Sequence, residues 1–109
     1  MHELAIAESV VDSVLDHTGE RRVSVVRLRV GRLSGVVPDA LMFCFELATA
    51  GTTIEGAELQ IEAPDGQAHC HACDHDFAVD DLVLLCTCGS ADVEVVAGRE
   101  LQVMSVQVT

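Results

Sequence analysis

The sequence contains no Lys, no Trp and no Tyr, and only 3% of its 109 residues are aromatic. Six Arg stand against 18 acidic residues, which gives a formal net charge of −12. Nucleic acids and anionic membranes attract proteins through basic residues that displace counterions, so this charge argues against both kinds of partner. It favours cationic ligands or a partner protein with a basic surface.

Long apolar runs are also missing. No stretch approaches the roughly 20 apolar residues that a membrane-spanning helix needs, and the start lacks the basic region of a secretory signal. We therefore expect a cytoplasmic protein, in which thiols stay reduced. Its five Cys are then better interpreted as metal ligands or core residues than as disulfides.

Apolar spacing predicts an α+β fold. Helical periodicity covers residues 3–17, with an apolar face of Leu4, Ala7, Val10, Val11, Val14 and Leu15. A second helix should begin at Pro38 and end before Gly51, with Leu41, Cys44, Phe45 and Ala48 facing inward. Alternating residues predict strands within 21–33, 57–63 and 101–108. We expect two helices on a three-stranded sheet over residues 1–65 and 98–109, with a small zinc-ribbon-like domain inserted at 66–97.

The insert carries four Cys as two close pairs, Cys70 with Cys73 and Cys86 with Cys88. Such a pattern can place four thiolates tetrahedrally around Zn(II), whose binding contributes roughly 10–16 kcal/mol and can fold a lobe with little core. The spacer of the second pair is one residue shorter than usual, so a nearby histidine could supply one zinc ligand in place of a cysteine: His69, His71 or His75. A redox pair at Cys70 and Cys73 is the alternative, but it lacks the usual strand-then-helix context. Cys44 is predicted to lie in the core.

The amino terminus has chemistry of its own. The Met1 α-amine, backbone amide nitrogens and the His2 imidazole can surround one ion, and the Glu3 amide is close enough to join them. Four nitrogens in a plane suit Ni(II) or Cu(II) and suit Zn(II) poorly. Met1 should be retained, because aminopeptidase removes Met before small residues and His is large. The alternative is an ordinary helix start, with Glu3 near the positive end of the dipole.

Three stretches together resemble the HypA/HybF family, the nickel metallochaperones of nickel–iron hydrogenase maturation. They are MHELAIAESVVDSV, LRVGRLSGVVPDALMFCFEL and CGSADVEVVAGRELQVMSVQV, in that order along the whole chain. The resemblance implies Ni(II) held by Met1, His2 and Glu3, and structural Zn(II) on Cys70, Cys73, Cys86 and Cys88. One departure is the second pair: the family has C-x-x-C, and Leu85 stands where its first ligand is expected. We infer that Cys86 serves as this zinc ligand instead.

The resemblance also implies a carrier and not an enzyme. It should pass nickel to the hydrogenase large-subunit precursor with the GTPase HypB, and some members serve urease maturation. We expect a monomer or weak dimer. The alternative is a zinc-ribbon module that binds protein or nucleic acid without any nickel role, for which Arg27, Arg29 and Arg32 are the only basic stretch. Glu8, Asp12 and Asp16 form either a solvated helix face or a docking face for a basic partner.

Overall fold

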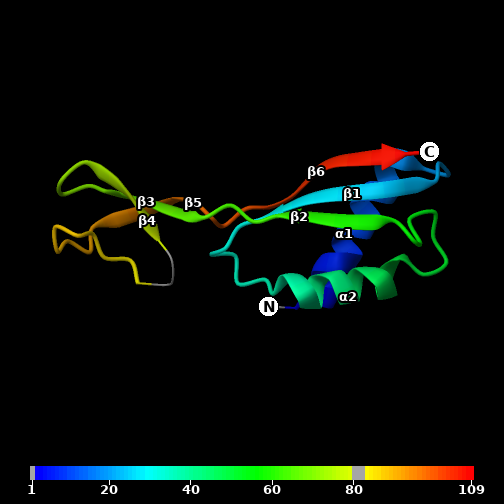
Figure 1. Cartoon of the computed structure of the whole chain (residues 1–109), viewed down its shortest axis with the longest axis horizontal. Helices are drawn as coiled ribbons and strands as arrows, with labels where there is room; N and C mark the ends of the chain where they lie inside the picture. Colours follow the sequence, from blue (N-terminus) through cyan, green and yellow to red (C-terminus); the bar gives the residue numbers. More distant parts are fainter. Residues whose placement is uncertain (1, 80–82) are drawn as a thin grey trace.

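The chain folds into two small sheets that lie end to end, so the molecule is 53 Å long but only 21 Å by 17 Å across (Figure 1). The computed structural model describes residues 2–79 and 83–109. In chain order the elements are α1 (Glu3–Thr18), β1 (Val23–Val30), α2 (Pro38–Thr49), β2 (Glu58–Glu62), β3 (Gly66–Cys70), β4 (His75–Val79), β5 (Val93–Ala97) and β6 (Leu101–Val108). This confirms the predicted α+β fold class, with a small Cys-rich lobe inserted before the last strand.

The first sheet has the strand order β2-β1-β6. β2 runs parallel to β1, with α2 as the crossover between them, and β6 returns antiparallel on the other side. Val26 of β1 lies opposite Leu59 of β2 and Val106 of β6. The predicted alternation of β1 is confirmed, since Val26, Leu28 and Val30 are buried and the intervening Arg side chains are only half-buried.

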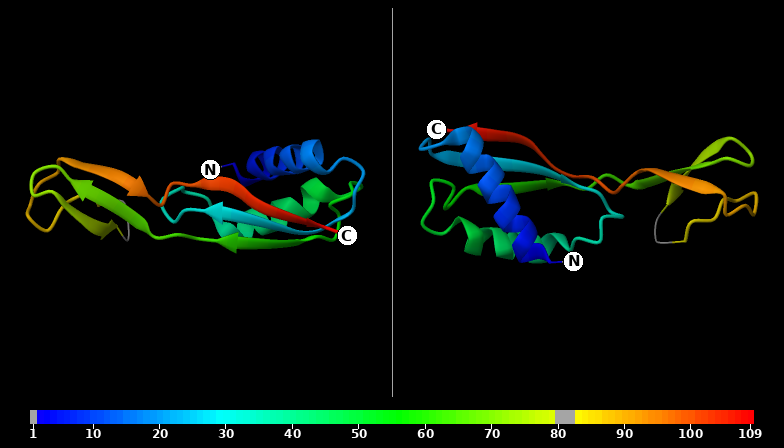
Figure 2. Two further views of the ribbon diagram at one scale, coloured as in Figure 1. Left: turned by 90° about the horizontal axis from the view of Figure 1, so that it is seen from above. Right: turned by 180° about the vertical axis from the view of Figure 1, so that it is seen from behind.

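Helix α1 crosses the back of this sheet diagonally (Figure 2). Its buried residues are Ala7, Val10, Val11 and Val14, as the helical spacing predicts. The prediction for Leu4 is wrong, because this side chain is 45% exposed. At 100° per residue Leu4 falls at the margin of the stripe centred on the four buried residues, so the sheet does not cover it.

Helix α2 packs against α1 and closes the core from the β2 side. Pro38 occupies its first turn, where the missing N–H costs nothing. Leu41 and Phe45 are buried and Cys44 and Ala48 are partly buried against the same core, which confirms the predicted inner face. The outer face of α2 exposes three large apolar side chains, those of Met42, Phe43 and Leu47.

The second sheet lies in the Cys-rich insert and has the order β4-β3-β5, with both pairings antiparallel. Its three strands were not predicted, because five-residue strands rich in His, Asp and Cys show no readable apolar alternation. Within the described part of this lobe, the buried hydrophobic side chains are those of Ala68, Cys70, Val79 and Cys86. Two of these four are cysteines, so apolar burial contributes little here.

Three glycines meet where the two sheets join. A Cβ on Gly31 would lie 2.1 Å from the Gly98 carbonyl oxygen, and a Cβ on Gly98 would lie 2.6 Å from the Gly66 Cα. The close approach allows the Leu33 N–H to bond the Gly98 carbonyl at 2.7 Å and the Gly31 N–H to bond the Glu100 carbonyl at 2.8 Å. The segment that leaves the second lobe is therefore hydrogen-bonded to the segment after β1.

Replacing Gly98 by Ala should destabilise the fold by more than the same change at Gly56. Both glycines have positive φ, +105° and +82°, but nothing lies within 4 Å of a Cβ on Gly56. Gly56→Ala should then cost about 1–2 kcal/mol of unfolding free energy from backbone strain alone. Gly98→Ala should cost about 1–3 kcal/mol more, from steric overlap with Gly66. Urea unfolding of both variants measures the difference, and equal losses would contradict a tightly packed junction.

Across the described residues, neither helix combines the length and apolar character that crossing a bilayer requires.

Candidate metal centres

Four cysteine sulfurs converge at the far end of the second lobe. Cys70 ends β3, Cys73 lies in the turn before β4, and Cys86 and Cys88 lie in the loop before β5. All four Sγ atoms lie within 4.8 Å of one another. The Cys70–Cys88 and Cys73–Cys86 sulfur distances are 3.7 Å and 3.6 Å. A tetrahedral zinc with Zn–S bonds near 2.3 Å requires sulfurs about 3.8 Å apart, so the donor set fits this ion.

The short C-x-C pair is brought into place by a tight turn. The Gly89 N–H bonds the Cys86 carbonyl at 2.9 Å, and the Cys86 N–H bonds the Ser90 carbonyl at 3.0 Å. Gly89 has a φ of 93°, which L residues rarely adopt and which turns the chain back after Cys88. The missing spacer residue is thus compensated by backbone geometry, and both thiols reach the cluster.

Backbone N–H groups prepare some of these thiols for a cation. The Cys88 N–H lowers the pKa of Cys86 to about 7, and the Cys73 N–H lowers the pKa of Cys70. In contrast, the hydrogen bond between Cys73 and Cys86 raises the pKa of Cys73 to about 12, because Cys73 keeps the shared proton. A metal ion would replace these shared protons, since coordinated thiols are deprotonated.

The neighbouring histidines do not join the sulfur cluster. His69 Nδ1 lies 2.6 Å from Asp76 and its Nε2 lies 3.0 Å from Asp74, so carboxylates occupy both ring nitrogens. His71 Nε2 lies 3.7 Å from Glu94, and His75 is exposed at the start of β4. The structure therefore brings together the four predicted cysteines and leaves the three alternative histidines outside the group.

The two carboxylates give a pH-dependent prediction for His69. Its pKa is raised, chiefly by the hydrogen bond to Asp76 and less by Asp74. Asp76→Asn should therefore lower the pKa of His69 more than the matched Asp74→Asn, as followed by NMR of the ring protons. A raised pKa stabilises the fold below the unfolded value of about 6.5 and loses this effect as pH rises through the folded value. Asp76→Asn should accordingly destabilise the lobe only at the acidic end, and an equal effect at alkaline pH would contradict the ion pair.

At the amino terminus the structure describes two of the three predicted nickel-binding residues. His2 is exposed at the start of α1, and its carbonyl accepts the first helical hydrogen bond from Ile6 at 3.1 Å. Within residues 2–79, the His2 side chain makes no capping hydrogen bond to α1. Met1 lies outside the described residues, so its predicted role stays a prediction.

Glu3 ties the amino terminus to the start of α2. One of its carboxylate oxygens accepts a hydrogen bond from the Val37 N–H at 3.2 Å, and this bond is the main reason why the pKa of Glu3 is lowered. The sequence did not predict this contact, because the two residues are 34 positions apart and no local pattern indicates that they meet. It fixes the first turn of α1 beside the start of α2 (Figure 1).

Comparison with known proteins decides the family. The model of the family described as "Hydrogenase/urease nickel incorporation, metallochaperone, hypA" matches residues 1–108. The chain belongs to the HypA family. It is 45% identical over 109 residues to hydrogenase maturation factor HypA of Geobacter metallireducens, covering 99% of both chains. It is 47% identical over 112 residues to HypA of Streptomyces avermitilis, covering 97% of this chain and 86% of that protein.

A HypA fold has been solved before. The solution structure of the nickel metallochaperone HypA from Helicobacter pylori matches with a TM-score of 0.69 at 21% sequence identity, over 99% of this chain and 97% of that one. At this identity the match shows the fold alone. This membership confirms the resemblance drawn from the sequence. The family is described as one of metallochaperones that act in nickel incorporation.

Proposed function

We propose that this protein carries Ni(II) at its amino terminus and delivers it to the hydrogenase large-subunit precursor. The observation that carries the proposal is the family match from residue 1 onward, which includes the Met-His-Glu start. The nickel ligands are the Met1 amine, the backbone amides that follow it and the His2 imidazole, with the Glu3 amide completing a planar set of nitrogens. Nickel is the cargo, and the protein is a carrier and not an enzyme.

The start of α1 supports this ligand set. The first N–H groups of a helix have no carbonyl partner within the helix, so binding an ion there breaks no helical hydrogen bond. The first intrahelical bond is from Ile6 to His2, so the Glu3 N–H lies ahead of the hydrogen-bonded ladder. Its own carboxylate, which the Val37 N–H also engages, accepts a contact from this N–H. That contact must be given up on metal binding, while the rest of the helix stays in place.

The second metal in this proposal is a structural Zn(II) on Cys70, Cys73, Cys86 and Cys88. When bound, it would supply the cross-link that the small core of the lobe lacks. We also propose residues 66–97 as a separate folding unit within residues 1–65 and 98–109. Support comes from the core of the helical part, which draws on α1, β1, α2, β2 and β6 and, among the described residues, on none of the Cys-rich lobe.

The setting we propose is cytoplasmic, with HypB as the GTPase that assists nickel transfer and urease accessory proteins as further recipients. A nucleic-acid role is disfavoured because the two arginines of β1 are already engaged. Arg27 donates to Gln60 and lies within hydrogen-bond distance of Ser105, while Arg29 pairs with Glu62 at 3.5 Å. The net charge of −12 would repel phosphates from the remaining surface.

Deleting the gene tests the proposed delivery. Cells grown with little nickel should then hold less nickel in their hydrogenase large subunit, and a plasmid copy of the natural chain should restore it. The His2→Ala variant should not restore it, whereas Leu47→Ala, an exposed change on α2, should. Full nickel loading of the large subunit in the deletion strain would contradict the proposed role, as would rescue by His2→Ala.

A further inference from the structure

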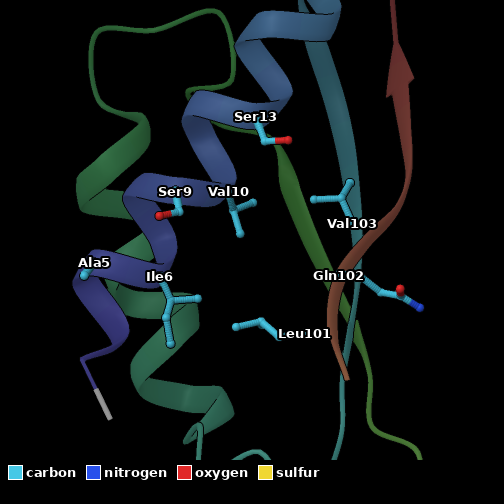
Figure 3. A pocket seen from close by; sticks show the side chains of 8 residues that line it. All are labelled: Ala5, Ile6, Ser9, Val10, Ser13, Leu101, Gln102 and Val103. Carbon is cyan, nitrogen blue, oxygen red and sulfur yellow. The ribbon is translucent and has the colours of Figure 1, made fainter. Parts of the chain in front are cut away.

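An apolar groove of about 400 Å³ lies between α1 and the edge strand β6. Figure 3 shows Ile6 and Val10 of α1 pointing toward Leu101 and Val103 of β6 across this space. The α1 wall is otherwise made of small side chains, which keep the groove open: Ala5, Ser9 and Ser13. A second hollow of about 390 Å³ extends the groove along β6 past Val103 to Val106.

The β6 edge beside the groove is unprotected backbone. Within the strands that the structure describes, β6 pairs with β1 alone, so its other edge is free. Natural proteins usually place charges or Pro on such edges to prevent further pairing. The other three edge strands follow this rule, since β2 carries Glu58 and Glu62, β4 carries Asp76 and β5 carries Glu94. The eight residues of β6 include no charged residue and no Pro.

A bulge limits how much of this edge is regular. Arg27 lies opposite Ser105 and Leu28 opposite Val103, so Met104 is the extra residue. Leu101–Val103 keep a regular register with β1, and these are also the β6 residues that line the groove. These three residues therefore have both an unpaired backbone edge and an apolar space beside them.

We propose that this groove binds an extended segment of a partner protein, which joins the first sheet as a fourth strand beside β6. Alternate side chains of a strand point to opposite faces. One set of partner side chains enters the space between Ile6, Val10 and Val103, while main-chain hydrogen bonds form along Leu101–Val103. Pairing of this kind takes affinity from the backbone and specificity from the side-chain pockets.

Charge identifies the chemistry of the segment. Glu8, Asp12 and Asp16 are exposed one turn apart on α1, and at 100° per residue they follow the rim formed by Ala5 and Ser9. A second copy of this chain would bring two molecules of net charge −12 together. The occupant is therefore an extended segment that places both β-branched residues and Arg or Lys on its α1-facing side, where the basic side chains reach the acidic residues of α1.

The groove lies beside the proposed nickel site, so its role in nickel transfer rests on the proposed function. Ala5 and Ile6 line one end, and the Ile6 N–H bonds the His2 carbonyl. A bound segment thus ends beside the proposed nickel site, where a partner docked on β6 could bring its own metal ligands to the ion.

A synthetic peptide tests the proposal on the full, zinc-loaded chain. The probe is a capped peptide of about ten residues in which every second position is Thr and the positions between are Val and Arg in turn, so that Val and Arg share one face of the strand. At about 1 mM it should shift the Leu101–Val103 amide resonances and slow hydrogen exchange along β6. The same peptide with Glu in place of Arg should not bind, and neither should a version N-methylated at every amide. Absence of any β6 response to the Val/Arg peptide would overturn the proposal, as would equal binding of the N-methylated version.

Two variants control the test. Ser9→Trp fills the groove and should weaken peptide binding at least about tenfold, whereas Leu47→Trp, at an exposed position on α2, should leave it unchanged. Equal binding by both variants would overturn the proposal. So would a concentration-dependent dimer that protects β6 without peptide, because a second copy would then be the occupant. Nickel titration of Ser9→Trp should match the natural chain, so failure of the groove and failure of the nickel site are distinguishable.

Discussion

Adding residues in front of Met1 should abolish tight Ni(II) binding. An extension converts the α-amine into an amide and moves His2 away from second position, so the fused chelate rings cannot form. Loss of outer-shell partners alone typically costs about 10–100-fold in metal affinity, and loss of a direct ligand should cost more than about 100-fold. Calorimetric titration with Ni(II) of the natural and extended chains measures the difference.

The matched control carries the same extension after Thr109. It should bind nickel like the natural chain, and both extended chains should keep their zinc, because the four cysteines lie in the far lobe. Nickel affinity that survives the amino-terminal extension would place the site elsewhere in the molecule.

Removing zinc should unfold the second lobe while the helical part stays folded. Structural zinc contributes roughly 10–16 kcal/mol of apparent binding free energy, and the buried hydrophobic residues of the lobe other than cysteine are Ala68 and Val79 among those described. A strong chelator, or Cys86→Ser, should collapse the NMR dispersion of residues 66–97. Signals from Val26, Leu28 and Leu41 should keep their folded positions.

Cys44→Ser is the control for loss of a thiol as such. Cys44 packs partly buried against the helical core and lies outside the sulfur cluster, so this variant should keep one zinc per chain. A lobe that remains dispersed with no bound zinc would contradict the structural role of the metal and the proposed folding units together.

Local periodicity made the helical part of the fold predictable. Ala7, Val10 and Val14 recur at helical spacing, and Val26, Leu28 and Val30 alternate as a half-buried strand does, so sequence and burial agree. Leu4 failed because it stands at the margin of an apolar stripe, where periodicity does not decide exposure. The strands β3, β4 and β5 failed because a lobe built around thiols needs no apolar alternation.

The site was predictable where chemistry depends on spacing. Four cysteines in two close pairs predict a shared ion, and the structure brings their sulfurs together. Contacts between distant segments left no such signal. The junction of Gly31 with Gly98, the Glu3–Val37 hydrogen bond and the groove along β6 all depend on how separate elements pack.

Titration of the untagged chain and its His2→Ala variant with Ni(II), followed by absorbance, tests the central claim most directly. The natural chain should develop the band of square-planar Ni(II) at one equivalent, and the variant should not, because a planar set of four nitrogens requires the imidazole. Zinc content should stay at one ion per chain in both. Identical nickel spectra from the two proteins would contradict a nickel site at the amino terminus.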